Sequence, residues 1–98
     1  MKYLLLLITF QAFALDGPAL FAQNCVLCHG PKGLGDGVAA SSLNPRPRNL
    51  MSDPFKNGDT VEQIEKTLKS GLNQMPAFTL SDEDKTKLAE FVKSLRSK

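Results

Sequence analysis

The second half of the chain repeats apolar positions at the three- and four-residue spacing of an amphipathic helix. One such set consists of Val61, Ile64 and Leu68. Thr60 precedes this set and Gln63 follows Thr60 by three residues, which is the capping-box pattern of a helix start. Gly71 stands where such a helix would end. The pattern therefore predicts a helix that begins after Thr60 and ends before Gly71.

A second apolar stripe predicts the last helix of the chain. Ser81 is a favourable cap, and the acidic residues 82–84 would place negative charge at the positive end of the helix dipole. The stripe consists of Leu88, Phe91, Val92 and Leu95. The basic residues near the negative end are Lys93, Arg96 and Lys98. Both charge and periodicity favour a helix from residue 82 to the end of the chain.

The segment from Gly17 to Cys28 predicts a first helix, because Pro18 suits the first helical position. Its apolar face can be formed by Leu20, Phe21 and either Val26 or Leu27. Residues 38–43 can add a short helical turn. No stretch of useful length alternates with the two-residue period of a β-strand. The sequence therefore predicts an all-α fold.

The first residues have the pattern of an export signal. Residues 1–3 form a short positive start, residues 4–10 are apolar, and Ala12-Phe13-Ala14 has the small-residue pattern of a cleavage site. The apolar run is shorter than the roughly 20 residues that span a bilayer, which disfavours an uncleaved membrane anchor. We expect residues 1–14 to be a signal peptide and residues 15–98 to form the mature domain, with no transmembrane segment after cleavage.

Composition mainly excludes other classes of protein. The 98 residues suffice for one small domain, and a net charge of +2 without a basic tract argues against a nucleic-acid partner. A domain of this size buries a limited core, and this one has no tryptophan. A rigid apolar group held by the chain would complete such a core.

The chain's two cysteines and its one histidine fall in one stretch, Cys25-Val26-Leu27-Cys28-His29. C-x-x-C-H is the attachment signature of c-type haem. Cys25 and Cys28 lie about one helical turn apart, so both can form thioethers with the vinyl groups of one porphyrin, and His29 can then ligate the iron. A thioredoxin-type pair would need a βαβ pattern, zinc would need a fourth ligand, and a disulfide here would constrain almost nothing. We therefore predict covalent attachment of haem through Cys25 and Cys28, with His29 as the proximal ligand.

Two loops follow the motif. The glycines of residues 30–37 can supply positive φ angles and close backbone approach to a flat ligand edge, but they lack the spacing of a phosphate-binding loop. Residues 44–50 contain Pro45 and Pro47 and should be extended. A carbonyl of this loop could accept the other ring N–H of His29. Either Arg46 or Arg48 could contact a haem propionate.

The second axial ligand must be another residue type, since His29 is the one histidine of the chain. After removal of Met1 two thioethers remain, Met51 and Met75. Met51 has the character of ordinary core filler, whereas Pro76 stiffens the loop behind Met75. We predict Met75 as the distal iron ligand; Met51, a lysine or an open site are the alternatives. His/Met ligation would raise the reduction potential and leave the iron no vacancy for oxygen or peroxide, which favours one-electron transfer.

Taken together, these parts resemble the class I monohaem cytochromes c, over nearly the whole mature chain. The matching parts are residues 17–21, the haem motif with Gly30, the proline loop, the segment Met75-Pro76-Ala77-Phe78 and the final helix. The resemblance implies the cytochrome c fold, with three main helices and short turns around one covalently bound haem and its iron. It also implies that the first and last helices cross, with Gly17, Phe21 and Phe91 at the crossing.

The resemblance further implies a periplasmic electron carrier rather than an enzyme, because haem is attached outside the bacterial inner membrane in such systems. We expect a monomer that docks transiently with redox partner proteins, a reductase or dehydrogenase as donor and an oxidase or other protein as acceptor. Lys32, Lys56 and Lys85 could ring the exposed haem edge. The alternative is a haem-based ligand-binding or sensor protein, or a haem subunit of a larger redox enzyme.

Overall fold

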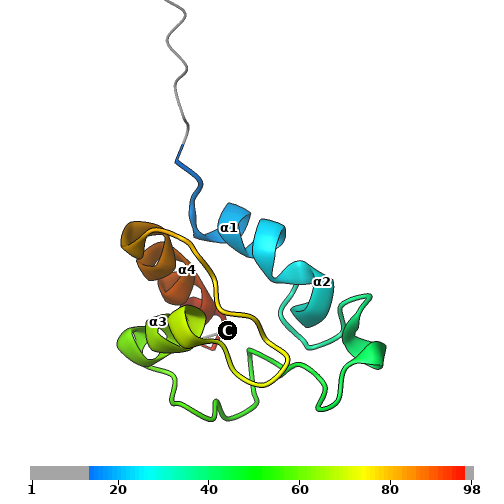
Figure 1. Ribbon diagram of the computed structural model, residues 1–98. Coiled ribbons are helices and arrows are strands. Elements are labelled where there is room, and N and C mark those ends of the chain that lie inside the picture. Colours follow the sequence, from blue (N-terminus) through cyan, green and yellow to red (C-terminus); the bar gives the residue numbers. More distant parts are fainter. Residues whose placement is uncertain (1–13, 97–98) are drawn as a thin grey trace, which may run out of the picture.

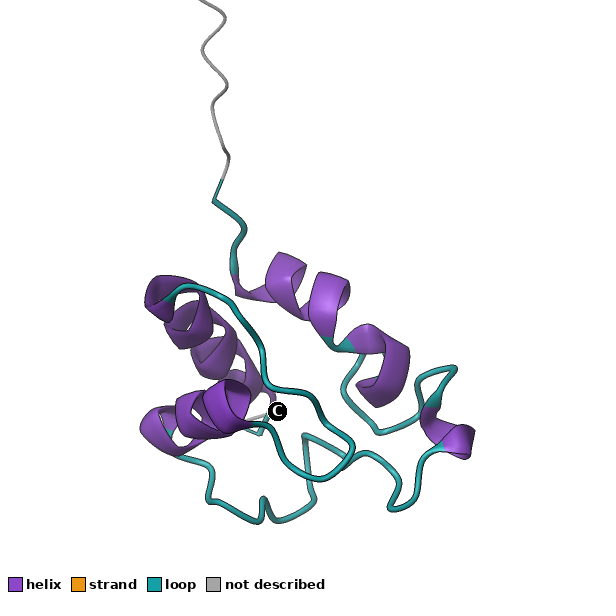
Figure 2. Ribbon diagram, in the orientation of Figure 1, coloured by secondary structure: helices purple, strands orange, loops and turns teal. Residues whose placement is uncertain are grey.

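The computed structural model describes residues 14–96, and the regular structure of this part of the chain is helical throughout (Figures 1 and 2). The helices are α1 (Gly17–Asn24), α2 (Val26–His29), the 3-10 helix η1 (Ala40–Ser42), α3 (Val61–Ser70) and α4 (Asp82–Leu95). α4 packs against both α3 and α1. The predicted all-α fold with three main helices is confirmed. The predicted signal peptide falls almost wholly outside the described residues.

The predicted first helix is divided into two, because the chain bends at Cys25 (φ −123°, ψ −24°). Asn24 lies just before the bend, and its side-chain amide donates to the carbonyl of Leu20 at 2.8 Å. Such local side-chain bonds compete with the helical ladder, which explains why the helix ends here. Cys25, at the bend, is buried in the core, and His29 is the last residue of α2. At the other end of α1, Asp16 accepts from the amide of Ala19 at 2.9 Å, a cap that the sequence reasoning missed.

The starts of α3 and α4 agree with the predicted caps. The Thr60 hydroxyl accepts from the Gln63 amide, the Gln63 side chain accepts from the Thr60 amide, and both distances are 3.1 Å. The Ser81 hydroxyl accepts from the amide of Asp84 at 3.1 Å. α3 ends at Gly71, as predicted. Each cap satisfies amides that have no partner within the helix.

α1 and α4 meet at the predicted residues. A Cβ atom at Gly17 would lie 2.8 Å from Cβ of Phe91 and 2.9 Å from the carbonyl oxygen of Lys87, so only glycine permits this approach. One turn further along α1, the rings of Phe21 and Phe91 pack at a centroid distance of 5.3 Å and an interplanar angle of 59°. Such tilted aromatic pairs are favourable. This contact fixes where α1 lies against α4.

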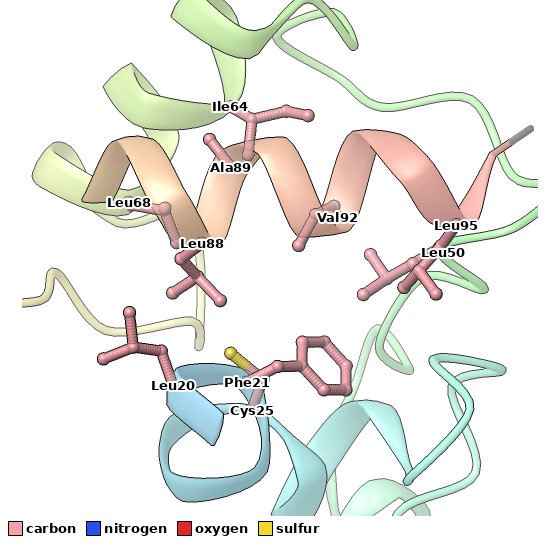
Figure 3. Packing of buried hydrophobic residues seen from close by; sticks show 10 residues of the cluster. All are labelled: Leu20, Phe21, Cys25, Leu50, Ile64, Leu68, Leu88, Ala89, Val92 and Leu95. Carbon is pink, nitrogen blue, oxygen red and sulfur yellow. The ribbon is translucent and has the colours of Figure 1, made fainter. Parts of the chain in front are cut away.

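The core lies mainly between α4 and the helices α1 and α3 (Figure 3). Leu88 is fully buried, and Cys25 directs its sulfur toward α4 from the end of α1 (Figure 3). The other members are Leu20, Phe21, Leu50, Ile64, Leu68, Ala89, Val92 and Leu95. Leu50 comes from the long loop between α2 and α3, so that loop also contributes to the core.

The glycines of residues 30–37 support the path of the loop after α2. Gly35 has φ +82°, and a Cβ atom there would lie 2.6 Å from the carbonyl oxygen of Pro47. The predicted positive φ is therefore confirmed. The close approach that the structure shows is to the protein backbone of the proline loop, because residues 33–35 pass directly over residues 47–50; the Leu50 amide donates to the carbonyl of Gly33.

Candidate functional site

One cavity brings together three of the four predicted site residues. Cys25 and His29 lie at the two ends of α2, Met75 comes from the loop between α3 and α4, and all three line it. The space not filled by protein atoms amounts to about 600 Å³, including the part open to solvent. The apolar walls are formed by Phe21, Leu50, Phe55, Ile64, Leu68, Leu72 and Val92. A cavity of this apolar character suits a large apolar ligand.

His29 is the last residue of α2, and the loop that follows orients its ring. Its Nδ1 lies 3.0 Å from the carbonyl oxygen of Arg48. Because a carbonyl can only accept, Nδ1 carries the proton and Nε2 keeps its lone pair for a metal ion. Burial lowers the pKa of His29, and the bond to Arg48 opposes part of this shift. The proline loop therefore does supply a carbonyl for His29, and the tertiary structure identifies the residue as Arg48.

The two cysteines differ in environment. Cys25 is buried in the core, whereas Cys28 is half-buried on α2 and does not line the cavity. Burial, and to a smaller extent Cys28, raise the pKa of the Cys25 thiol to about 12. The two cysteines form no disulfide with each other. Within residues 14–96 no three or more His, Cys, Asp and Glu side chains group as metal ligands would, so the zinc alternative gains no support.

Met75 is presented by a short turn with paired backbone bonds. The Leu72 amide donates to the Met75 carbonyl at 3.0 Å, and the Met75 amide donates to the Leu72 carbonyl at 2.9 Å. Asn73, inside the turn, has a positive φ of 54°. The neighbouring Gln74 side chain accepts from the Asn44 amide at 2.9 Å, which ties the turn to the proline loop. From the sequence, we attributed the stiffness of this loop to Pro76. These hydrogen bonds were not predicted, because no local sequence motif indicates them.

The structure separates the remaining candidates by position. Met51 packs against the core but does not line the cavity. Arg48 lines the cavity, and Arg46 does not. Of the three lysines, Lys56 lines the cavity, whereas Lys85 pairs with Asp82 at 3.9 Å on α4. Phe55, Asn57 and Gly58, which the sequence reasoning did not consider, complete the wall beside Lys56.

The donor set and the lining fit a haem. A neutral imidazole nitrogen and a thioether sulfur line the same apolar cavity, and these are the ligand types that c-type haem iron takes. Two basic residues, Arg48 and Lys56, line the same cavity, and their side-chain type suits the two propionates. The residues present are therefore those that a haem needs on its faces and its polar edge.

Comparisons with known proteins agree with this geometry. Residues 12–92 match the family described as cytochrome C oxidase, cbb3-type, subunit III. The chain is 32% identical over 89 residues to cytochrome c6 of Gracilaria tenuistipitata var. liui, covering 87% of this chain and 75% of that protein. Among solved structures, it is similar to a chain of the Kuenenia stuttgartiensis reducing HAO-like protein complex, with a TM-score of 0.68 and 26% identity.

That alignment covers 86% of this chain and 43% of the Kuenenia chain, so the protein spans less than half the length of this structural relative. The predicted cytochrome c fold is confirmed, as is the predicted cofactor, a covalently bound c-type haem with its iron. The chain belongs to the cbb3-type subunit III family of c-type cytochromes, and its function is electron transfer by that haem.

Proposed function

We propose that this protein is a periplasmic one-electron carrier with His/Met axial ligation. In this proposal Cys25 and Cys28 form the thioethers to the haem, His29 is the proximal ligand and Met75 is the distal ligand. The single observation that carries it is that His29 and Met75, far apart in the sequence, line one mainly apolar cavity. Met51, the other candidate thioether, is absent from the lining.

Hydrogen bonds within the chain support this ligation because they fix the positions of the His29 and Met75 side chains. The Arg48 carbonyl keeps the His29 ring in one tautomer, so Nε2 remains a ligand atom. The paired bonds between Leu72 and Met75 hold the thioether on a rigid turn. Bound haem supplies an iron that alternates between Fe(III) and Fe(II), and ligation on both faces favours electron transfer over oxygen chemistry.

The basic residues at the cavity support a definite orientation of the porphyrin. We assign Arg48 and Lys56 to the propionate edge, since they are the lysine and arginine residues that line the cavity in the described part of the chain. Arg46 has no part in this assignment. Carboxylates paired with arginine and lysine are well stabilised where water is partly excluded.

The proposal includes export and transient partners. Residues 1–14 would be removed as a signal peptide, which leaves residues 15–98 as the mature domain in the periplasm. No helix within residues 14–96 is long and apolar enough to cross a membrane. Redox partner proteins would dock at the haem edge, and a monomer suffices for such encounters.

A second candidate is a haem-carrying subunit held within a larger redox complex. Two observations favour it: the matching family is described as an oxidase subunit, and the structural relative belongs to a protein complex. Such a subunit would use the same site residues but would have a permanent partner surface.

The test is an optical spectrum of the exported, mature protein, oxidised and reduced, with and without carbon monoxide. We expect sharp low-spin bands, a weak far-red sulfur-to-iron band and no shift with carbon monoxide. A high-spin spectrum that shifts readily would refute Met75 ligation and favour the sensor alternative. Gel filtration of the exported protein from its native periplasm separates the carrier, which elutes alone, from the subunit, which elutes in a complex.

A further inference from the structure

Arg96, just after α4, makes three contacts with the segment that precedes α3. Its Nε lies 2.9 Å from Oδ2 of Asp59, and its Nη1 donates to the carbonyl of Leu50 at 3.0 Å. Its guanidinium carbon lies 4.3 Å from the centroid of the Phe55 ring. The side chain is only 17% exposed, so these contacts are partly shielded from water. One side chain therefore joins both ends and the middle of residues 50–59.

Residues 50–59, which we call the wall segment, form one side of the cavity. Leu50, Phe55, Lys56, Asn57 and Gly58 all line it. The segment contains turns but no helix. The Leu50 amide donates to the Gly33 carbonyl, and the other backbone bonds described for the segment join residues no more than four positions apart. Its side-chain link to α3 is a bond of 3.1 Å from the Asn57 amide to the Thr67 hydroxyl, which is exposed. The Arg96 contacts are less exposed and involve a full charge, so they are the stronger attachment.

The end of α4 is a rigid point of attachment. Leu95 and Val92 belong to the buried core, and Val92 also lines the cavity. A side chain that follows them directly is thereby fixed relative to the core. Asp59 receives a second cation, Lys93, whose Nζ lies 3.7 Å from the same Oδ2 atom. Lys93 is 44% exposed and makes no bond to Leu50 or Phe55, so it contributes charge but does not reach the segment's other two contact points.

We propose that Arg96 is a positioning residue of the haem crevice: it fixes the wall segment against α4 and thereby limits the access of water to the haem. This inference rests on the proposed function, because it assigns the cavity to a haem ligated by His29 and Met75. A looser wall would raise the polarity around the iron, which stabilises the more highly charged Fe(III) state and lowers the reduction potential. Lysine cannot replace Arg96, since its single nitrogen does not provide the fork that meets Asp59 and Leu50 together.

The experiment uses the holoprotein and compares Arg96→Ala with Lys93→Ala, which removes the other cation from the same carboxylate. Amide hydrogen exchange is measured along the chain, and the reduction potential is measured for each variant. In Arg96→Ala we expect exchange in residues 50–59 to accelerate by about tenfold or more, with a lowered potential and little change in α1. Lys93→Ala should accelerate exchange there by less than about threefold. Arg96→Lys should resemble Arg96→Ala more closely than wild type.

Equal exchange in the Arg96→Ala and Lys93→Ala proteins would overturn the proposal, as would acceleration spread evenly over the whole chain. If Arg96→Ala yields no holoprotein, Asp59→Asn removes the charge that pairs with both Arg96 and Lys93 and is compared with Lys93→Ala. Acceleration confined to residues 55–59 and larger than in Lys93→Ala is then the supporting result; none there overturns it. The comparison of hydrogen exchange between the variants does not require Met75 to be the iron ligand. A high-spin wild-type spectrum would therefore refute the proposed ligation separately, while the exchange data still decide the role of Arg96.

Discussion

The Nδ1 atom of His29 and the carbonyl oxygen of Arg48 lie 3.0 Å apart, across 19 residues of the chain. This bond joins the end of α2 to the proline loop. Because the acceptor is a backbone atom, the orientation of the imidazole depends on the path of that loop and not on the side chain of residue 48. The same loop is tied to the turn before Met75 through the Asn44–Gln74 bond. The segments that hold the two proposed ligands are therefore linked to each other.

Burial of His29 predicts a definite dependence of stability on pH. Its pKa in the folded protein lies below the ordinary value of 6.5, so the unfolded chain takes up the proton first as the pH falls. The contribution of the neutral ring to stability is therefore complete above pH 6.5 and is lost as the pH falls below that value toward the lowered pKa. Iron ligation at Nε2 would also favour the neutral ring in the folded state, so we expect the denaturant midpoint of the holoprotein to decline over this interval. A midpoint that rises there would contradict the lowered pKa.

Replacing Met75 with alanine should open the iron. We expect carbon monoxide binding, loss of the far-red band and a reduction potential lower by on the order of 100 mV, within the roughly 0.8 V range that axial ligands cover. Electrochemistry and optical spectra check this.

The matched control is Met51→Leu, which removes the other thioether from a position packed on the core outside the cavity. This swap nearly conserves volume, so stability should change by less than about 1.5 kcal/mol, with an unchanged spectrum. Loss of the far-red band in Met51→Leu, and not in Met75→Ala, would reverse the assignment.

Because of the contact between α1 and α4, we expect replacement of a helical glycine by alanine to lower the stability of the protein instead of raising it. In an exposed helix, alanine is more stable than glycine by about 1 kcal/mol. At Gly17 the added Cβ would meet Cβ of Phe91 at 2.8 Å, so we expect Gly17→Ala to destabilise the protein by about 1–3 kcal/mol. Denaturant unfolding of the holoprotein measures this. Ala22→Gly on the exposed face of α1 serves as the control for helix propensity alone.

Replacing a buried leucine should reduce stability far more than replacing an exposed one. Leu88 is fully buried between the helices, so Leu88→Ala is expected to cost about 3–5 kcal/mol through the cavity that it leaves. Leu27 is 62% exposed on α2, and Leu27→Ala should change stability by about 0.5 kcal/mol or less. Thermal or denaturant unfolding of both variants tests this, and similar losses in the two would contradict the described burial.

Removing both attachment thiols tests how far the fold depends on the haem. In Cys25→Ser, Cys28→Ser protein, we expect no haem to remain after denaturing electrophoresis. The mature domain should then be largely unfolded by far-ultraviolet circular dichroism, because the apolar walls of a cavity of about 600 Å³ would face water. A cooperative transition close to the midpoint of the holoprotein would show that the helices form a sufficient core by themselves.

Features that depend on near neighbours in the chain could be predicted from the sequence. The caps at Thr60 and Ser81, the end of α3 at Gly71 and the haem motif rest on bonds or spacings within four residues. The break at Cys25 was not predicted. An asparagine side chain such as Asn24 can bond to nearby backbone atoms both inside and outside a helix, so the sequence alone does not distinguish the two cases. The Gly17–Phe91 contact was predicted through the family resemblance and could not follow from spacing.

The sequence by itself thus determined the chemistry that this protein can perform: two thiols and an imidazole at haem spacing, an all-helical chain and two candidate thioethers. Only the tertiary structure decided which loop carbonyl orients His29, that Met75 and not Met51 lines the cavity, and that Arg96 holds its wall. These relationships join residues 19 to 46 positions apart. All three relationships depend on how the loops that connect the helices pack over α4 and α1. That packing is determined by the whole core, so no local run of residues is sufficient to predict it.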